Sequence, residues 1–163
     1  SKSKLSNIFF NNISADALDV DFGEMNFQNI YCEDIGNDCL DVSGATIYGE
    51  NLTSINVSDK GLSAGEKSNI KIKNMNFFRN YIALAVKDGS SAFLDNIKLK
   101  ENIYDIALFN KKNEFGKPTL TINKLEPINK KKIIQSIGTN LLINGDNFFG
   151  KMSDQDINLN IYR

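Results

Sequence analysis

Residues 29–44, NIYCEDIGNDCLDVSG, decide the fold, because their pattern of apolar side chains recurs both before and after them along the chain. A leucine recurs every 22 residues at Leu18, Leu40, Leu62 and Leu84, and Leu108 follows after 24. An asparagine keeps nearly the same register at Asn7, Asn29, Asn51, Asn74 and Asn96, with Asn123 and Asn144 as expected later members. An internal repeat of this length indicates a solenoid.

Apolar and polar residues alternate on both sides of each asparagine, and alternation with period 2 predicts β-strands. The position two residues before the asparagine holds Leu5, Phe27, Gly49, Ile72 and Leu94. A repeat with three short strands cannot bury its own inward face, so the turns must stack as a parallel β-helix. We expect the asparagines to form an amide ladder at one corner of the coil.

This repeat resembles the right-handed parallel β-helix of the pectate-lyase-like superfamily. The resemblance implies an all-β solenoid with about 22 residues and three short strands per turn, or rung, and roughly six to seven rungs. This fold hosts lyases, hydrolases, epimerases, phage spikes and adhesins, so it does not by itself specify an activity.

We expect one β-helix domain over residues 1–163. It divides into regular rungs (5–110), a protruding loop (111–118), degenerate rungs (119–145) and a C-terminal cap (146–163). Leu5 and Asn7 already stand in register, so no capping segment covers the first rung. The chain is therefore expected to be the C-terminal part of a longer β-helix, or to meet a partner chain at its N-terminal edge.

Composition limits the classes of partner. With 19 basic and 20 acidic residues, the net charge of −1 predicts no nucleic-acid partner. No apolar run is long enough to span a bilayer. The two cysteines, Cys32 and Cys39, fall in one rung, and we interpret them as small core or corner residues rather than as a disulfide or a nucleophile.

Aspartates stack on the expected outer surface. Asp19 lies between inward residues and has Asp41 as its neighbour one rung later, while Asp16 and Asp38 form a second pair. Like charges on neighbouring strands cost up to about 1 kcal/mol. Two such pairs side by side need an explanation.

Three explanations stay open. Calcium could bind Asp16, Asp19, Asp38 and Asp41, because clustered carboxylates suit this hard cation. Paired carboxylates could instead act as acid and base, with the candidates Asp19, Asp38, Asp41 and Asp59. Finally, Lys60 and Lys87 could neutralise the patch as an ordinary mixed surface.

The segments NDCLDVSG, SDKGLSAGE and ALAVKDG are similar in layout to the successive rungs of polygalacturonase-type glycoside hydrolases. In this resemblance Asp38 matches the second aspartate of the acidic motif, and Lys87 matches the lysine of the basic motif. Lys60 stands where the family has histidine, and the chain contains no histidine. The resemblance implies that Lys60 or Lys87 binds a uronate carboxylate.

The function we expect is a non-catalytic β-helical module of a larger surface or secreted protein, located outside the cell or at its surface. Its acidic face would bind a cation or carbohydrate, and Phe9 and Tyr31, stacked on another outward face, would offer a platform for a sugar ring. A polysaccharide-active hydrolase, lyase or epimerase is the first alternative. A structural spacer or spike segment is the second.

Overall fold

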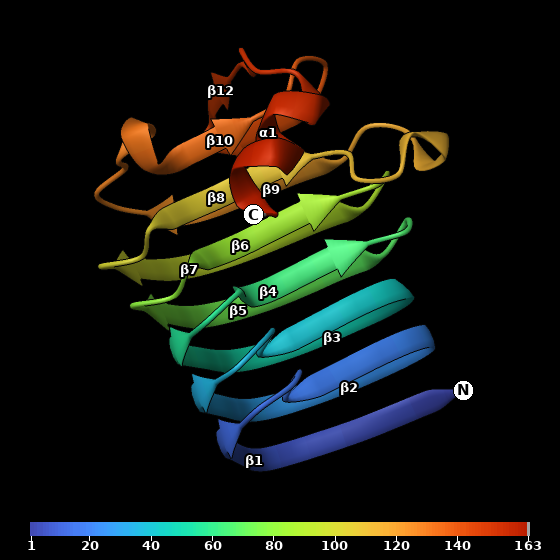
Figure 1. Ribbon diagram of the computed structural model, residues 1–163. Helices are drawn as coiled ribbons and strands as arrows, with labels where there is room; N and C mark the ends of the chain where they lie inside the picture. The colour runs from blue at the N-terminus through green and yellow to red at the C-terminus, as the bar shows by residue number, and fades with distance from the viewer. Residues whose placement is uncertain (163) are drawn as a thin grey trace.

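The structure, a computed structural model that describes residues 1–162, is an all-β parallel solenoid of about six turns (Figure 1). Its strands are β1 (Lys2–Ile13), β2 (Leu18–Ile35), β3 (Leu40–Val57), β4 (Lys60–Gly65), β5 (Asn69–Phe78), β6 (Ile82–Lys87), β7 (Ser91–Lys100), β8 (Tyr104–Phe109), β9 (Thr119–Leu125), β10 (Ile133–Gln135), β11 (Asn140–Ile143) and β12 (Asp146–Phe148). The helices are the 3-10 turns η1 (Asn113–Phe115) and η2 (Lys130–Lys132) and the helix α1 (Asp154–Ile161).

The first rungs run as long continuous strands, and the later rungs split in two. Strand β3 pairs in parallel with β2, then with β4 through its first part and with β5 through its second. From there one sheet continues through β4, β6, β8 and β10, and the other through β5, β7, β9 and β11. The split falls at Glu66 and Lys67, which both have positive φ and lengthen this corner by one residue.

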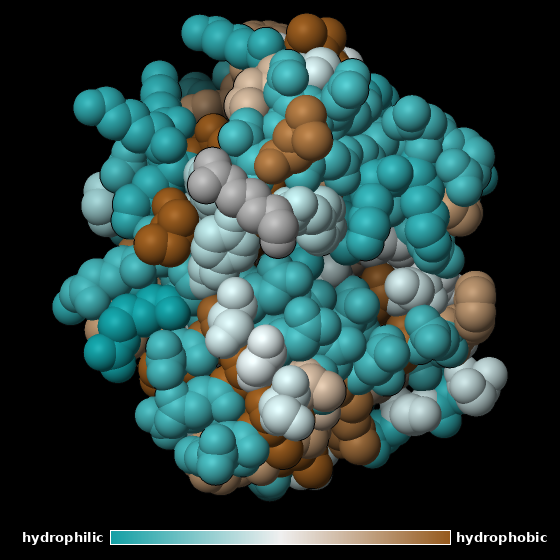
Figure 2. Space-filling model, in the orientation of Figure 1, coloured by the Kyte–Doolittle hydropathy of each residue, from teal (hydrophilic) through white to brown (hydrophobic). Residues whose placement is uncertain are grey.

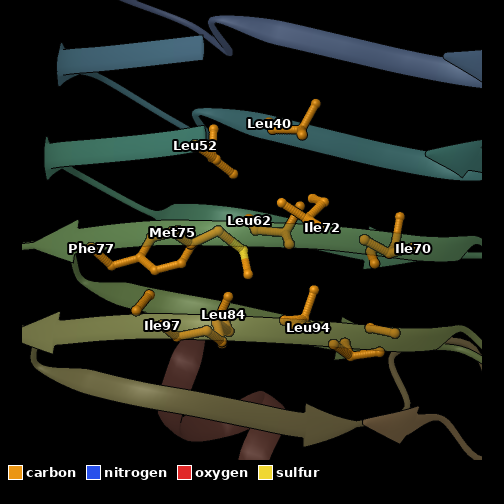
Figure 3. Close-up of a cluster of buried hydrophobic side chains, with 14 of the residues drawn as sticks. Leu40, Leu52, Leu62, Ile70, Ile72, Met75, Phe77, Leu84, Leu94 and Ile97 are labelled. Atoms are coloured by element: carbon orange, nitrogen blue, oxygen red, sulfur yellow. The ribbon is translucent and has the colours of Figure 1, made fainter. Parts of the chain in front are cut away.

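The predicted columns form the core. Leu40, Leu62 and Leu84 are direct neighbours with no exposed surface, and they face the apolar residues of the opposite sheet (Figure 3). The leucine column continues at Ile106, because Leu84 pairs with Ile106 and Val86 pairs with Leu108. The prediction that Leu108 continues the leucine column is therefore wrong. The spacing between neighbours in this column stays at 22 residues as far as Ile106.

The asparagine column marks one corner, as predicted. The five early asparagines (Asn7, Asn29, Asn51, Asn74 and Asn96) have φ between 55° and 64°, a region that asparagine tolerates better than most residues. Asn29 Nδ2 donates to Asn7 Oδ1 at 2.7 Å, and Asn51 Nδ2 donates to Asn29 Oδ1 at 2.7 Å. These bonds join successive rungs as an amide ladder.

The later members of this column differ from the prediction. Asn123 pairs with Asp95, and Lys124, with φ 57°, takes the corner position instead. Asn144 has φ 51° and binds the backbone N–H and carbonyl of Leu125 through its side chain. The long excursion between β8 and β9 shifts the register, so the count of residues no longer locates the corner.

The expectation that the two cysteines are unpaired is wrong. Cys32 and Cys39 form a disulfide, and both are fully buried. The chain turns at Asp34, which has φ 55°, and brings the two Cα atoms within 5.9 Å, inside the usual range of about 4.4–6.8 Å. The bond therefore links β2 to the residue just before β3, on the two sides of one corner.

The C-terminal segment lies against the side of the solenoid. Strand β12 pairs antiparallel with β11, while α1 lies over β6 and β8 rather than across the last rung (Figure 1). Ile157 and Ile161 of α1 pack against Ile82, Ala85 and Ala107, whose columns face outward on earlier rungs. Hydrophilic residues cover most of this side of the molecule (Figure 2). No helix among residues 1–162 has the length and apolar character that crossing a membrane requires.

Candidate functional site

The outward aspartates stack as predicted at the N-terminal end of the solenoid. Asp19 pairs with Asp41, which pairs with Ser63, and Asp21 pairs with Ser43. We call Asp19, Asp21 and Asp41 the acidic face. Partial burial and then the neighbouring carboxylates Asp21, Asp41 and Asp16 raise the pKa of Asp19. The acidic face therefore carries repulsion between like charges.

The second stacked pair, Asp16 and Asp38, binds the backbone. Asp16 Oδ1 accepts the N–H of Asp38 at 2.9 Å and the side-chain amide of Asn37 at 2.6 Å. Asp38 Oδ1 accepts the N–H of Lys60 at 2.9 Å. Each carboxylate thus satisfies a backbone donor of the next rung, where the chain enters the strand.

Lys60 takes the next position of the Asp16–Asp38 column and forms a buried ionic network. Its Nζ lies 2.6 Å from Asp59 Oδ2 and 3.6 Å from Asp38 Oδ1. Lys60 is 3% exposed and Asp38 is 4% exposed. Burial, opposed by Lys60 and reinforced by Asp59 and Asp41, raises the pKa of Asp38 to about 7. For Lys60, burial favours the neutral amine, but Asp38, Tyr162 and Asp59 outweigh it and raise its pKa.

The C-terminal segment covers this network. The Tyr162 ring centroid lies 5.1 Å from Lys60 Nζ and 4.5 Å from Lys111 Nζ, which places two cations against one aromatic ring. The Tyr81 hydroxyl donates to the carbonyl oxygens of Asn160 and Ile161, each at 3.4 Å. Asp38 and Lys60 are therefore enclosed and Asp59 is partly exposed, whereas Asp19 and Asp21 of the acidic face stay exposed.

Lys87 lies two positions along β6 from Ala85 and is half-buried. Burial and then the nearby Lys60 lower its pKa, while Asp41 and Asp38 act in the opposite direction. Within residues 1–162 it makes no ion pair closer than 4 Å. Lys60 and Lys87 are thus brought to the same side of the solenoid as the acidic face, as the polygalacturonase-like layout implied.

The proposed calcium ligands do not converge. Among residues 1–162 no three His, Cys, Asp or Glu side chains are placed to hold one metal ion. Asp16 and Asp38 already accept backbone hydrogen bonds. The calcium prediction therefore depends on Asp19 and Asp41 alone.

We expect Asp19→Asn to raise the free energy of unfolding by up to about 1 kcal/mol at neutral pH, because it removes one member of a like-charge pair. The gain should shrink in high salt, which screens exposed charges. Thermal unfolding with added calcium and with chelator checks this result. A calcium-dependent melting temperature that Asp19→Asn/Asp41→Asn abolishes would instead show that the pair binds calcium.

Phe9 and Tyr31 form the predicted aromatic platform. Their ring centroids lie 5.1 Å apart with a tilt of 38°, and Phe9 is 60% exposed. The rings line a shallow depression of about 320 Å³. Its other lining residues are Asn7, Ile8, Asn29, Ile30, Asn51 and Thr53. Aromatic rings and amides therefore share one open surface.

Two parts of the site were not foreseen from the sequence. Tyr162 and Lys111 lie outside the regular repeat, so the period does not place them beside Lys60. Tyr48 and Phe93 do lie within it, and both project outward from the middle segment of their rungs. Their spacing within the repeat could have identified them.

Comparison of the chain with protein-family models, with curated proteins and with solved structures finds no match.

Proposed function

We propose that this chain is a non-catalytic β-helical module of a surface or secreted protein and that it binds carbohydrate on its outer surface. The observation that carries the proposal is the Phe9–Tyr31 platform, which lies beside the asparagine ladder in an open depression. Aromatic faces stack against the apolar faces of sugar rings, and amides offer both donors and acceptors to hydroxyl groups.

The ionic network supports a non-catalytic module. Asp59 pairs with Lys60, and Asp38 accepts a backbone N–H and is enclosed. A general acid or base must reach the proton that it transfers, either directly or through one water molecule. Two of the four carboxylates expected as catalysts are thus engaged within the protein.

The disulfide supports the proposed location. Cys32 and Cys39 are bonded, and such bonds persist mainly in oxidising compartments such as the cell exterior. A place in the pectate-lyase-like superfamily is part of the same proposal, and the parallel stacking of rungs about 22 residues long supports it.

The platform is tested by binding of soluble glycans to the wild type, Phe9→Ala and Tyr31→Ala. We expect a glycan that the wild type binds to lose about tenfold in affinity with Tyr31→Ala, because the stacking surface is removed. Phe149→Ala is the matched control, because Phe149 is 80% exposed and lies near the C-terminal end of the chain. Equal binding by all four proteins would contradict the role of the platform.

A polysaccharide-active enzyme is the second candidate, favoured by one observation. The pKa of Asp38 is raised to about 7, which suits a general acid at neutral pH. In that case the wild type would cleave a polysaccharide and Asp38→Asn would not. A non-catalytic module cleaves none in either form.

Strand β1 presents an open edge at one end of the described solenoid. Within residues 1–162, β1 pairs with β2 and with no strand on its other side, and Leu5, Ile8 and Phe10 are only half-buried there. Unpaired backbone groups on a strand edge accept another strand.

A further inference from the structure

A ladder of outward side chains runs along the middle segment of the rungs, on a face distinct from the Phe9–Tyr31 platform. Its members, in order along the solenoid axis, are Lys4, Asn26, Tyr48, Lys71, Phe93 and Thr121. Lys71 is the neighbour of both aromatic residues, so Tyr48 and Phe93 lie two strand spacings apart. This separation is about 10 Å.

Two adjoining depressions follow this ladder. The first, about 320 Å³, lies between the two aromatic residues and includes Lys71 and Asp95 in its lining. The second, about 240 Å³, continues from Tyr48 toward the first rung and includes Asn26 and Gln28. Both are lined by Tyr48, Gly49 and Lys73, so they form one groove along the axis.

Gly49 gives the groove its floor. A Cβ atom on Gly49 would lie 2.2 Å from the ring of Phe27, which fills the core beneath it. The groove therefore rests on a buried aromatic ring and not on a mobile segment. Its two exposed rings, Tyr48 at 42% and Phe93 at 46%, project from this rigid floor.

The polar lining is nearly neutral and offers both donors and acceptors. Lys73 Nζ lies 3.8 Å from Glu50 Oε1, and Lys124 Nζ lies 3.9 Å from Asp95 Oδ1. Asp95 Oδ1 is enclosed, so the exposed part of this carboxylate is Oδ2. Among residues 1–162 Lys71 has no ion pair, which leaves its ammonium group as a donor between the two rings.

The geometry points to a neutral, extended polysaccharide chain that binds in this groove along the solenoid axis. Sugar rings stack on Tyr48 and Phe93, whose separation matches alternate residues of a flat hexose chain. Lys71 donates to a hydroxyl or ring oxygen between them, and Asp95 Oδ2 accepts from a hydroxyl. This inference rests on the proposed carbohydrate-binding function and assigns it a second surface and a ligand class.

Charge separates this ligand from other occupants. The lining alternates the lysines Lys4, Lys71 and Lys73 with the carboxylates Glu50 and Asp95, and this mixture of both signs suits the hydroxyl groups of a neutral chain better than a chain of uniform charge. Charged side chains all along the groove also disfavour an apolar protein surface, which would leave them unpaired when buried.

The test is calorimetric titration of the whole chain with cellohexaose, and separately with hexagalacturonate. We expect the wild type to bind cellohexaose and to lose about tenfold in affinity with Tyr48→Ala or Phe93→Ala. Asp95→Ala should also weaken binding, while Phe149→Ala should leave it unchanged. Since all four side chains are exposed or half-exposed, the unfolding temperatures of the variants should stay close to that of the wild type.

Other results overturn the inference in distinguishable ways. If Tyr31→Ala abolishes glycan binding and Phe93→Ala leaves it intact, the groove is not the binding surface. The proposed carbohydrate-binding function would still stand. A preference for hexagalacturonate that Lys71→Met abolishes would overturn the neutral ligand class. Absence of wild-type binding to any glycan in a broad panel would overturn both the inference and the proposed function.

Discussion

Lys60→Met should lower the free energy of unfolding by about 3–5 kcal/mol at pH 7.5, because it removes the buried cation that Asp38 and Asp59 share. Lys60 Nζ lies 2.6 Å from Asp59 and 3.6 Å from Asp38, and it is enclosed beneath Tyr162. Methionine keeps the apolar stem of the side chain, so the loss reports the charge. Urea unfolding followed by circular dichroism measures it.

Lys73→Met is the matched control for this prediction. Lys73 also pairs with a carboxylate on a neighbouring rung, Glu50 at 3.8 Å, but both side chains are exposed. An exposed pair contributes about 0–1 kcal/mol. Equal losses of unfolding free energy in the two variants would mean that burial does not make the Lys60 ion pairs more stabilising than an exposed pair. The deficit of Lys60→Met should shrink in acid, where Asp38 takes up a proton.

The period of the repeat predicted most of the core. Leu40, Leu62 and Leu84 stack without exposed surface, and Asn29 and Asn51 occupy the expected corner. These positions are predictable because a side chain facing the core is constrained by the rungs on both sides. A second corner column, whose residues all have positive φ, consists of Asn12, Asp34, Asn56, Arg79 and Glu101. This column repeats at nearly the same spacing as the asparagine column, but its residues are of different types, so residue type alone does not reveal the repeat.

The exposure of the site could not be predicted from the repeat. Asp19 and Ser63 belong to one outward column, yet Asp19 is exposed and Ser63 is fully buried. The difference arises from the C-terminal segment, whose residues Ile161 and Tyr162 pack over the later rungs. Periodicity assigns a side chain to the inside or outside of the coil, but contacts from outside the repeat decide whether water reaches it.

The disulfide shows a related limit. The sequence places Cys32 and Cys39 in one rung as small core or corner residues, but their spacing alone does not reveal how the corner folds between them. The turn at Asp34 brings their Cα atoms within 5.9 Å. A bond across one rung therefore depends on the corner geometry, which the 22-residue period leaves open.

Asp38→Asn should remove a pH dependence of stability that the wild type shows between about pH 4 and pH 7. The pKa of Asp38 is about 7 in the folded state, against an ordinary value of 3.8. In this window the folded protein holds a proton that the unfolded chain has released. Wild-type stability therefore falls as pH rises, by up to about 4 kcal/mol from this group, at 1.36 kcal/mol per unit of pKa.

Asparagine does not titrate, but its Oδ1 still accepts the N–H of Lys60, so the bond that crosses the rungs can persist. The difference in unfolding free energy, wild type minus Asp38→Asn, should accordingly decline from pH 4 to pH 7 and level off above it. A carboxyl titration by NMR gives an independent value, and a midpoint near 4 would contradict the prediction. The cation of Lys60 holds the pKa of Asp38 down, so the midpoint should move higher still in Lys60→Met, which ties the two predictions to one network.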